Sequence, residues 1–343
     1  MNQLSFGVIG CGALAQSVHL PLLRGMKGVR VTAVCDSNPE RLTQAVHCFS
    51  YPVHHFSNFR ELLASGVTQA ILVSTPPDSH AAIAGEVLKS NNHLYLEKPI
   101  ATDLTEAREL VTVSRVQSVV STIGFNFRFH PLLVDLKHLL ETQYLGQPLF
   151  ARSVFSTIAQ SRPHWARTDT IAGVFQELAS HEIDLTRFLF GCDIHQVFAQ
   201  SIIDPSSICL DLHLTNGGVA QVFCSLQSNE TAQYEVFGTL CSARVDRYQS
   251  WKVRICPLRA EGKAGAILRA VKEISGFPYA LRRWRAPANE VSYARILSAF
   301  VEKIRTGHGT LPTLEDGLRC LAIEQAAVES LHINRPIEPT LDF

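Results

Sequence analysis

Short apolar segments alternate with segments of helical periodicity over the first 125 residues, and this alternation constrains the fold most strongly. The expected strands are Leu4–Ile9, Val29–Cys35, Ala70–Ser74, His93–Leu96 and Val119–Gly124. Strands that alternate with helices of about 10–15 residues predict βαβ units and a parallel sheet. Right-handed crossovers then give a doubly wound α/β fold, which we expect over residues 1–125.

Strand-like segments follow one another directly after Phe125, with few helices between them. They are Leu149–Ile158, Gln196–Ile203, Ile208–Leu214, Val219–Leu226, Gln233–Phe237 and Lys252–Ile255. Further helices are expected at Pro131–Glu141, Ser180–Phe190, Val291–Thr306 and Leu314–His332. Consecutive strands predict an open, mostly antiparallel sheet. We therefore expect a second α/β domain over residues 126–343.

The composition excludes several classes of protein. Apolar residues make up 46% of the chain and charged residues 18%, which suits a folded core and not a disordered chain. Lys plus Arg equals Asp plus Glu at 31 each, so no nucleic-acid partner is expected. A membrane partner is not expected either, because no apolar segment is long enough to span a bilayer. The nine cysteines form no C-x-x-C pair, which favours free thiols in the cytoplasm and no metal site.

A glycine motif ends the first expected strand and opens the first expected helix. The motif is G-x-G-x-x-A, formed by Gly10, Gly12, Ala13, Leu14 and Ala15. In this position such a motif indicates dinucleotide binding, because the second glycine lets the backbone approach a pyrophosphate. The helix N-terminus then offers free N–H groups to the phosphates.

An acidic residue ends the second expected strand. Asp36 lies 24 residues beyond Gly12, near the distance expected for the carboxylate that binds the adenosine ribose. It is followed by Ser37 and not by an arginine, so NAD(H) is favoured over NADP(H). Two alternatives stay open: Arg41 could still reach a 2′-phosphate, and Asp36 could simply cap the following turn.

Two further loops follow expected strands of the same sheet. The first contains Thr75, Pro76, Pro77 and His80, and the second contains Glu97 and Lys98. Ligands bind at the carboxyl ends of parallel strands in open α/β sheets. Both loops are therefore candidates for cofactor binding.

Taken together, these motifs resemble the glucose–fructose oxidoreductase, inositol dehydrogenase and rhizopine-catabolism (Gfo/Idh/MocA) family. The resemblance also includes three later segments, which are G-F-N-F-R-F at 124–129, E-L-A-S-H-E-I-D at 177–184 and P-T-L-E-D-G-L at 312–318. It covers essentially the whole chain. It implies a Rossmann domain followed by an α/β domain that binds substrate and often forms a homodimer or homotetramer through its open sheet.

The resemblance also assigns catalytic residues. Lys98 corresponds to the family's active-site lysine and His181 to its catalytic histidine, with roles that could be exchanged. Glu177 stands where the family has aspartate, and Ala179 where it has glycine, which leaves the role of Glu177 open. Ala179 suggests that a positive φ is not required there. The alternative for His181 is a helix histidine bonded locally.

Several polar residues are weaker candidates for binding substrate. They are Asn126, Arg128, Arg162, Trp165, Arg167 and Asp184. Asp184 could instead orient His181, or it could be an acid on the helix surface. The segment 244–285 is unusually basic, with 11 Lys and Arg against three Asp and Glu. It could be a lid over a negatively charged substrate, a membrane-surface helix, or a solvated insert or subunit contact.

The resemblance implies an NAD-dependent oxidoreductase that moves a hydride between nicotinamide and a secondary hydroxyl or keto group. The substrate would be a sugar, a cyclitol or a nucleotide sugar. One alternative is a redox-neutral sugar-processing enzyme, glycosidase-like, that retains its NAD. Another is a non-catalytic ligand sensor on the same fold.

Overall fold

The computed structural model describes residues 3–158, 171–201, 206–257, 279, 281, 284–286 and 290–341. The chain divides into two compact units. Unit 1 contains Met1–Asn126 and Ala286–Leu321, and unit 2 contains Phe127–Arg285 and Ala322–Asp342.

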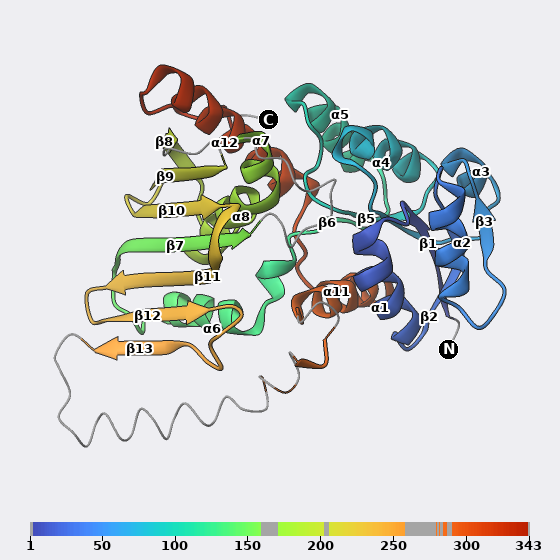
Figure 1. Ribbon diagram of the computed structural model, residues 1–343, viewed down its shortest axis with the longest axis horizontal. Helices are drawn as coiled ribbons and strands as arrows, with labels where there is room; N and C mark the ends of the chain where they lie inside the picture. The colour runs from blue at the N-terminus through green and yellow to red at the C-terminus, as the bar shows by residue number, and fades with distance from the viewer. Residues whose placement is uncertain are drawn as a thin grey trace. The chain divides into compact units, whose positions relative to one another are not determined.

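Unit 1 is built on a six-stranded sheet in the order β3-β2-β1-β4-β5-β6 (Figure 1). All of its pairings are parallel. The strands are β1 (Leu4–Ile9), β2 (Val29–Cys35), β3 (His54–Phe56), β4 (Ala70–Val73), β5 (His93–Leu96) and β6 (Ser121–Ile123). The expected doubly wound sheet is confirmed. Its strand order reverses direction between β1 and β4, which is where open α/β sheets bind ligands.

Helices connect these strands and begin where the sequence provides caps. They are α1 (Leu20–Gly25), α2 (Pro39–His47), α3 (Phe59–Ala64), α4 (His80–Lys89) and α5 (Leu104–Val116). The Asn38 side chain accepts hydrogen bonds from the N–H groups of Glu40 and Arg41, and Asp103 caps α5 in the same way. Each cap satisfies two N–H groups in the first turn of its helix. The short elements β3 and α3 were not anticipated, because β3 has only three residues and two of them are exposed.

A late segment of the chain also belongs to unit 1. Helix α11 (Ser292–Thr306) brings the Phe300 ring to 6.1 Å from the Phe6 ring and 5.9 Å from the Tyr95 ring. Arg305 near the end of α11 donates a hydrogen bond to the Gly28 carbonyl oxygen at 2.6 Å. The domain boundary expected at residue 125 placed this segment in the second domain. Burial of its apolar face against β1 and β5 accounts for its place here.

Unit 2 is built on a seven-stranded sheet in the order β13-β12-β11-β7-β10-β9-β8. The strands are β7 (Pro148–Ile158), β8 (Ile194–Ser201), β9 (Ser207–Leu214), β10 (Val219–Ser225), β11 (Gln227–Gly238), β12 (Cys241–Asp246) and β13 (Arg254–Pro257). Only β7 and β10 run parallel, so the expectation of a mostly antiparallel sheet is confirmed. Strand β12 was not anticipated.

Helices lie against one face of this sheet. They are α6 (Pro131–Glu141), α7 (Ile171–Val174), a π-helical turn η6 (Phe175–Ala179), α8 (Ser180–Phe190) and α12 (Leu314–Ile333). The division between the units falls within α12, after Leu321. Alternate residues of β9 are fully buried, as expected for a strand with one covered face. On β7 and β11 the rings of Phe150 and Phe237 lie 6.0 Å apart, and both are more exposed than their neighbours Ala151 and Val236.

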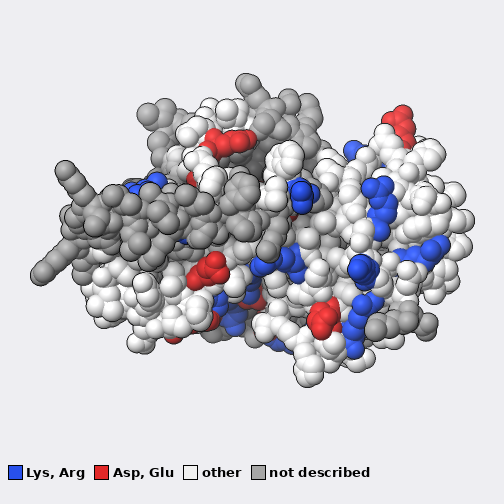
Figure 2. Space-filling view, turned by 90° about the horizontal axis from the view of Figure 1, so that it is seen from below, with Lys and Arg blue, Asp and Glu red and all other residues white. Residues whose placement is uncertain are grey.

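The basic segment 244–285 begins inside this sheet. Arg244 lies on β12 and Arg254 on β13, so its first part is strand, while residues 258–278 lie outside the described residues. On the face that Figure 2 presents, Lys and Arg side chains of the described residues form separate patches among uncharged ones. No helix among the described residues is both long and apolar enough to cross a membrane.

Candidate functional site

The loops that the sequence singled out in unit 1 all lie at one edge of the parallel sheet. The glycine motif follows β1, Asp36 follows β2, the Thr75 loop follows β4, and Lys98 follows β5. Because parallel strands point the same way, their carboxyl ends bring these segments to the same edge. The structure thus gathers the proposed cofactor residues of unit 1.

The two glycines of the motif have different environments. Gly10 has a φ of +89°, and a Cβ there would lie 2.4 Å from the Ser74 carbonyl oxygen. A Cβ on Gly12 would meet nothing within 4 Å, so its backbone borders open space. Ala13 and Leu14 form the first helical turn, and Ala15 is fully buried. Gly10 therefore allows the close packing of two loops, while the space beside Gly12 fits an approaching pyrophosphate.

This contrast gives a testable pair of variants. Gly10→Ala is expected to destabilise the protein by about 1–3 kcal/mol or more, because it forces a strained backbone and a clash. Gly12→Ala is expected to leave thermal unfolding almost unchanged and to weaken NADH binding at least about tenfold, since the methyl group occupies the pyrophosphate's approach. Thermal denaturation and NADH fluorescence titration measure the two effects. Unchanged NADH affinity in Gly12→Ala would contradict this assignment.

Asp36 makes two hydrogen bonds to backbone groups. Its Oδ2 accepts from the Cys11 N–H at 2.7 Å, and its Oδ1 accepts from the Asn38 N–H at 2.8 Å. The carboxylate therefore stabilises the glycine loop and the turn that follows Asp36. The second of these roles is the one that the alternative of a turn cap expected. Each oxygen can accept a second hydrogen bond, so a ribose contact remains compatible with this geometry. Ser37 and Arg41 beside it are exposed.

The Thr75 loop is held by His80. The Nδ1 atom of this buried ring lies 2.6 Å from the Pro99 carbonyl oxygen, and its Nε2 lies 2.8 Å from the Thr75 carbonyl oxygen. Burial lowers the pKa of His80, and the two carbonyl oxygens act in the opposite direction. Both ring nitrogens therefore contact the chain itself. Pro76 and Pro77 separate Thr75 from α4, and Pro76 is exposed.

Glu97 beside Lys98 contacts a histidine that the sequence analysis did not single out. The Oε1 of buried Glu97 lies 2.9 Å from the Nε2 of His19, which is fully buried at the end of the π-helical turn η1 (Ala15–His19). The rings of Tyr95 and Tyr293 lie 5.9 and 5.7 Å from the His19 ring. Burial raises the pKa of Tyr95, with the charge of Glu97 acting in the same direction. Lys98 itself is half-buried.

In unit 2, His181 is the second residue of α8, and α8 directly follows the π-helical turn η6. Its ring is buried, 4.7 Å from the Phe127 ring and 6.3 Å from the Phe155 ring. Glu177 is half-buried four residues earlier in the same helical run, which keeps both side chains near one helix face. Ala179 has a φ of −66°, which confirms that this position needs no positive φ.

A fully buried ion pair lies next to His181. Arg247 Nη1 lies 2.6 Å from Glu182 Oε1, and neither side chain is exposed to solvent. The Arg247 guanidinium also lies 4.4 and 4.3 Å from the centres of the Phe127 and Phe155 rings, the same two rings that contact His181. Ser153 Oγ donates a short hydrogen bond to Glu182. The residues that surround the histidine are thus held by charge as well as by packing.

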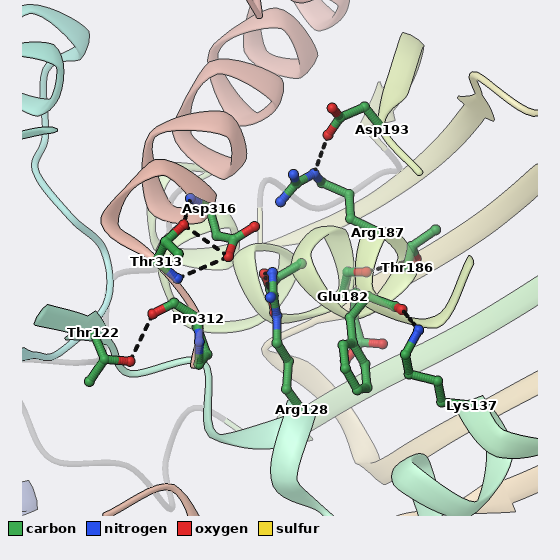
Figure 3. Close-up of polar contacts among 12 residues, drawn as sticks. Thr122, Arg128, Lys137, Glu182, Thr186, Arg187, Asp193, Pro312, Thr313 and Asp316 are labelled. Atoms are coloured by element: carbon green, nitrogen blue, oxygen red, sulfur yellow. Dashed lines mark hydrogen bonds and ion pairs between the residues drawn. The ribbon is translucent and has the colours of Figure 1, made fainter. Parts of the chain in front are cut away.

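Arg128 and Asp184 form a second ion pair in unit 2. The guanidinium Nη2 and Nε lie 2.5 and 2.9 Å from the two carboxylate oxygens, which is a bidentate arrangement. Figure 3 shows Arg128 extending from the turn after Asn126 toward α8, with Glu182 and Thr186 on that helix. Asp184 is therefore paired with Arg128. The Arg187 contact with Asp193 is also shown, at 2.7 Å.

The remaining expected residues have other environments. Asn126, assigned to unit 1, is buried, and its Nδ2 donates to Ser292 Oγ at 2.7 Å. Arg162, Trp165 and Arg167 lie outside the described residues. Within the described part of the chain, no group of His, Cys, Asp and Glu could hold a metal ion.

Sequence reasoning missed His19, Glu182 and Arg247. Each is a buried polar residue whose partner lies far away in the chain or in another element, and periodicity gives no sign of such pairs. For Glu182 and His19 one sequence signal was available. Each is a charged or polar residue in an expected helix that also carries one of the motifs named above.

Comparisons with known proteins agree with this architecture. A family model described as "Oxidoreductase family, NAD-binding Rossmann fold" matches residues 4–125, and the model of the Gfo/Idh/MocA C-terminal domain matches residues 133–244. The chain is 25% identical to an uncharacterised oxidoreductase, YrbE, of Bacillus subtilis, over 98% of this chain and 96% of that protein. It is 22% identical to the myo-inositol 2-dehydrogenase of Thermotoga maritima, over 98% of each.

A solved structure shares the fold across both units. An oxidoreductase of Agrobacterium radiobacter, in complex with NAD⁺, L-tartaric acid and magnesium, matches with a TM-score of 0.80 and 20% identity over 98% of each chain. Because the two family models together match most of the chain, in the order of the two expected domains, the chain belongs to the Gfo/Idh/MocA family of oxidoreductases with an NAD-binding Rossmann fold.

Proposed function

We propose that this protein is an NAD(H)-dependent dehydrogenase that oxidises or forms a secondary hydroxyl group of a cyclitol or a sugar. The observation that carries the proposal is the glycine loop after β1, whose open space at Gly12 lies on the same sheet edge as Asp36 and Lys98. The similarity to a myo-inositol 2-dehydrogenase over 98% of both chains supports the substrate class.

The chemistry needs a hydride acceptor and a proton acceptor. When bound, NAD supplies the nicotinamide carbon that takes or gives the hydride. The chain would hold it through Gly10, Gly12 and Asp36, whose backbone and carboxylate groups fit a pyrophosphate and a ribose. For the proton we propose His181, since an imidazole is the side chain best suited to take or give a proton near neutral pH. We propose that Lys98 polarises the hydroxyl and stabilises developing negative charge on its oxygen.

The preference for NAD(H) over NADP(H) is part of this proposal. The negative charge of Asp36 would repel a 2′-phosphate. Asp36→Asn keeps one side-chain oxygen able to accept the Cys11 N–H and removes the charge. We expect this variant to lower the ratio of NAD⁺ to NADP⁺ efficiency about tenfold, as measured by kcat/KM for each cofactor. A ratio that does not change would assign Asp36 to the loop alone.

The substrate class is tested with a panel of free cyclitols, free sugars and nucleotide sugars. We expect NADH formation with at least one cyclitol or sugar, together with thermal stabilisation of the NADH complex by the same compound. Turnover of a substrate without net change in NADH would favour the redox-neutral alternative. Thermal stabilisation without any turnover, across the whole panel, would favour a ligand sensor.

We also propose that copies of the chain associate, as a homodimer or homotetramer, through the face of the unit 2 sheet that carries Phe150 and Phe237. Phe150 and Phe237 lie on that face, beside an ion pair between Arg152 and Glu235 at 2.7 Å. Exposed aromatic rings with a charged rim are typical of subunit contacts. The oligomeric state stays a prediction.

A further inference from the structure

Two buried histidines contact the residues on either side of Lys98. On one side, His19 Nε2 lies 2.9 Å from the Glu97 carboxylate. On the other side, His80 Nδ1 lies 2.6 Å from the Pro99 carbonyl oxygen. His19 is fully buried and His80 is 1% exposed. All of these residues belong to unit 1.

The two histidines come from two different loops at the same sheet edge. His19 ends the π-helical turn that follows the glycine motif, so it belongs to the helix that the dinucleotide would face. His80 begins α4, and its Nε2 lies 2.8 Å from the Thr75 carbonyl oxygen in the loop after β4. The segment that carries Lys98 is thereby connected to the loops that follow β1 and β4, two of the other segments of the proposed cofactor site.

The surroundings leave these contacts little freedom. The rings of Tyr95 and Tyr293 lie edge-on to His19, which fixes the plane of the imidazole. A Cβ on Gly124 would lie 2.7 Å from Glu97 Oε2, so the glycine makes room for the carboxylate. Burying two imidazoles and a carboxylate is unfavourable unless polar groups lie near them. The groups near His19 Nε2 and His80 Nδ1 belong to Glu97 and Pro99, which stand on either side of Lys98, while the group near His80 Nε2 belongs to Thr75 in the neighbouring loop.

We infer that His19 and His80 are positioning residues for Lys98, holding the backbone before and after it so that its amine stays where the reacting hydroxyl would bind. This inference rests on the proposed function. A reactive group must be held to within about half an ångström, and a displacement of about 1 Å can lower the rate by about 100-fold. Two supports from two loops meet that requirement better than the loop alone.

His80 allows a sharp test, because asparagine and glutamine replace different atoms of its ring. An asparagine amide nitrogen can occupy the place of Nδ1, and a glutamine amide nitrogen the place of Nε2. His80→Asn thus keeps the contact with Pro99 and loses the one with Thr75, while His80→Gln does the reverse. We expect His80→Gln to lower kcat at least about tenfold more than His80→Asn, and His80→Asn to raise the NADH dissociation constant more than His80→Gln.

His19 is tested by a pair of the same kind. His19→Leu removes the contact with Glu97 and is expected to lower kcat by about 10–100-fold, while His19→Gln keeps a donor at the Nε2 position and is expected to recover most of that loss. Leu62→Ala, at a fully buried position in α3, is the control. It should lower the stability of the protein without removing a contact to the residues beside Lys98. Thermal unfolding, NADH fluorescence titration and kcat are measured for every variant.

The outcomes separate the inference from the proposed function. If the wild-type protein turns over substrate and Lys98→Ala does not, equal kcat values for His80→Asn and His80→Gln overturn the inference alone. The same holds if His19→Leu loses no more kcat than Leu62→Ala at a matched loss of thermal stability. If Lys98→Ala keeps the wild-type kcat, both the proposed function and the inference are overturned.

Discussion

Replacing His181 or Lys98 with alanine is expected to lower kcat by about 10²–10⁴-fold. The lost proton transfer accounts for this range at His181, and the lost stabilisation of developing negative charge accounts for it at Lys98. The two variants are also expected to differ in their pH profiles, since the group that takes the proton gives the acidic limb of kcat. Loss of that limb in His181→Ala, but not in Lys98→Ala, assigns the proton transfer to His181.

Binding measurements make this expectation specific. Neither residue is expected to carry the affinity for the adenosine half of the cofactor, so NADH should bind both variants within a few-fold of the wild-type dissociation constant. Thermal unfolding shows whether each variant is folded. Full activity in both variants, with wild-type unfolding temperatures, would remove the basis for the catalytic assignment.

Arg247→Met is expected to destabilise unit 2 by about 3–5 kcal/mol. Both Arg247 and Glu182 are fully buried, and removing the guanidinium leaves the Glu182 carboxylate without its compensating charge. The guanidinium also packs against Phe127 and Phe155, which in turn contact His181. We therefore expect kcat to fall in this variant even at temperatures where it stays folded. Urea denaturation measures the first effect and steady-state kinetics the second.

The double variant Arg247→Met with Glu182→Gln provides the control. Removing both charges avoids an unpaired buried carboxylate, so the double variant is expected to be more stable than Arg247→Met alone. The glutamine can still accept the hydrogen bond from Ser153. If the two residues do not interact, Glu182→Gln should lower the free energy of unfolding by the same amount in Arg247→Met as in the wild-type protein. That result would contradict the expected ion pair.

The sequence predicted those parts of the fold that depend on local signals. Leu4–Ile9 and Val29–Cys35 are strands at the expected residues, and the helices expected at Pro131–Glu141 and Ser180–Phe190 have the expected bounds. Helix α11 was expected as a helix, but its packing in unit 1 was not, because the contact between Phe300 and Phe6 joins residues that are far apart in the chain. A hydrophobic pattern shows that a face is buried without showing what covers it.

The candidate site divides in the same way. Gly10, Gly12, Asp36 and Lys98 were found because each follows a strand of a parallel sheet, where position in the chain predicts position at the sheet edge. The partners of His19, His80 and Arg247 could not be found, because a buried polar contact depends on how distant segments meet. The second hydrogen bond of Asp36, to Cys11, is of this kind as well.

Transfer of deuterium from a substrate tests the central claim most directly. A cyclitol or sugar that the panel identifies, carrying deuterium on the carbon of its reacting secondary hydroxyl, is incubated with the protein and NAD⁺ for a single turnover. Mass spectrometry of the recovered nucleotide then reports where the label went. We expect deuterated NADH in the wild-type protein and, after the same reaction time, about 10²–10⁴-fold slower appearance of it in Lys98→Ala or His181→Ala. Oxidised product with no deuterium in the nucleotide would contradict hydride transfer to NAD.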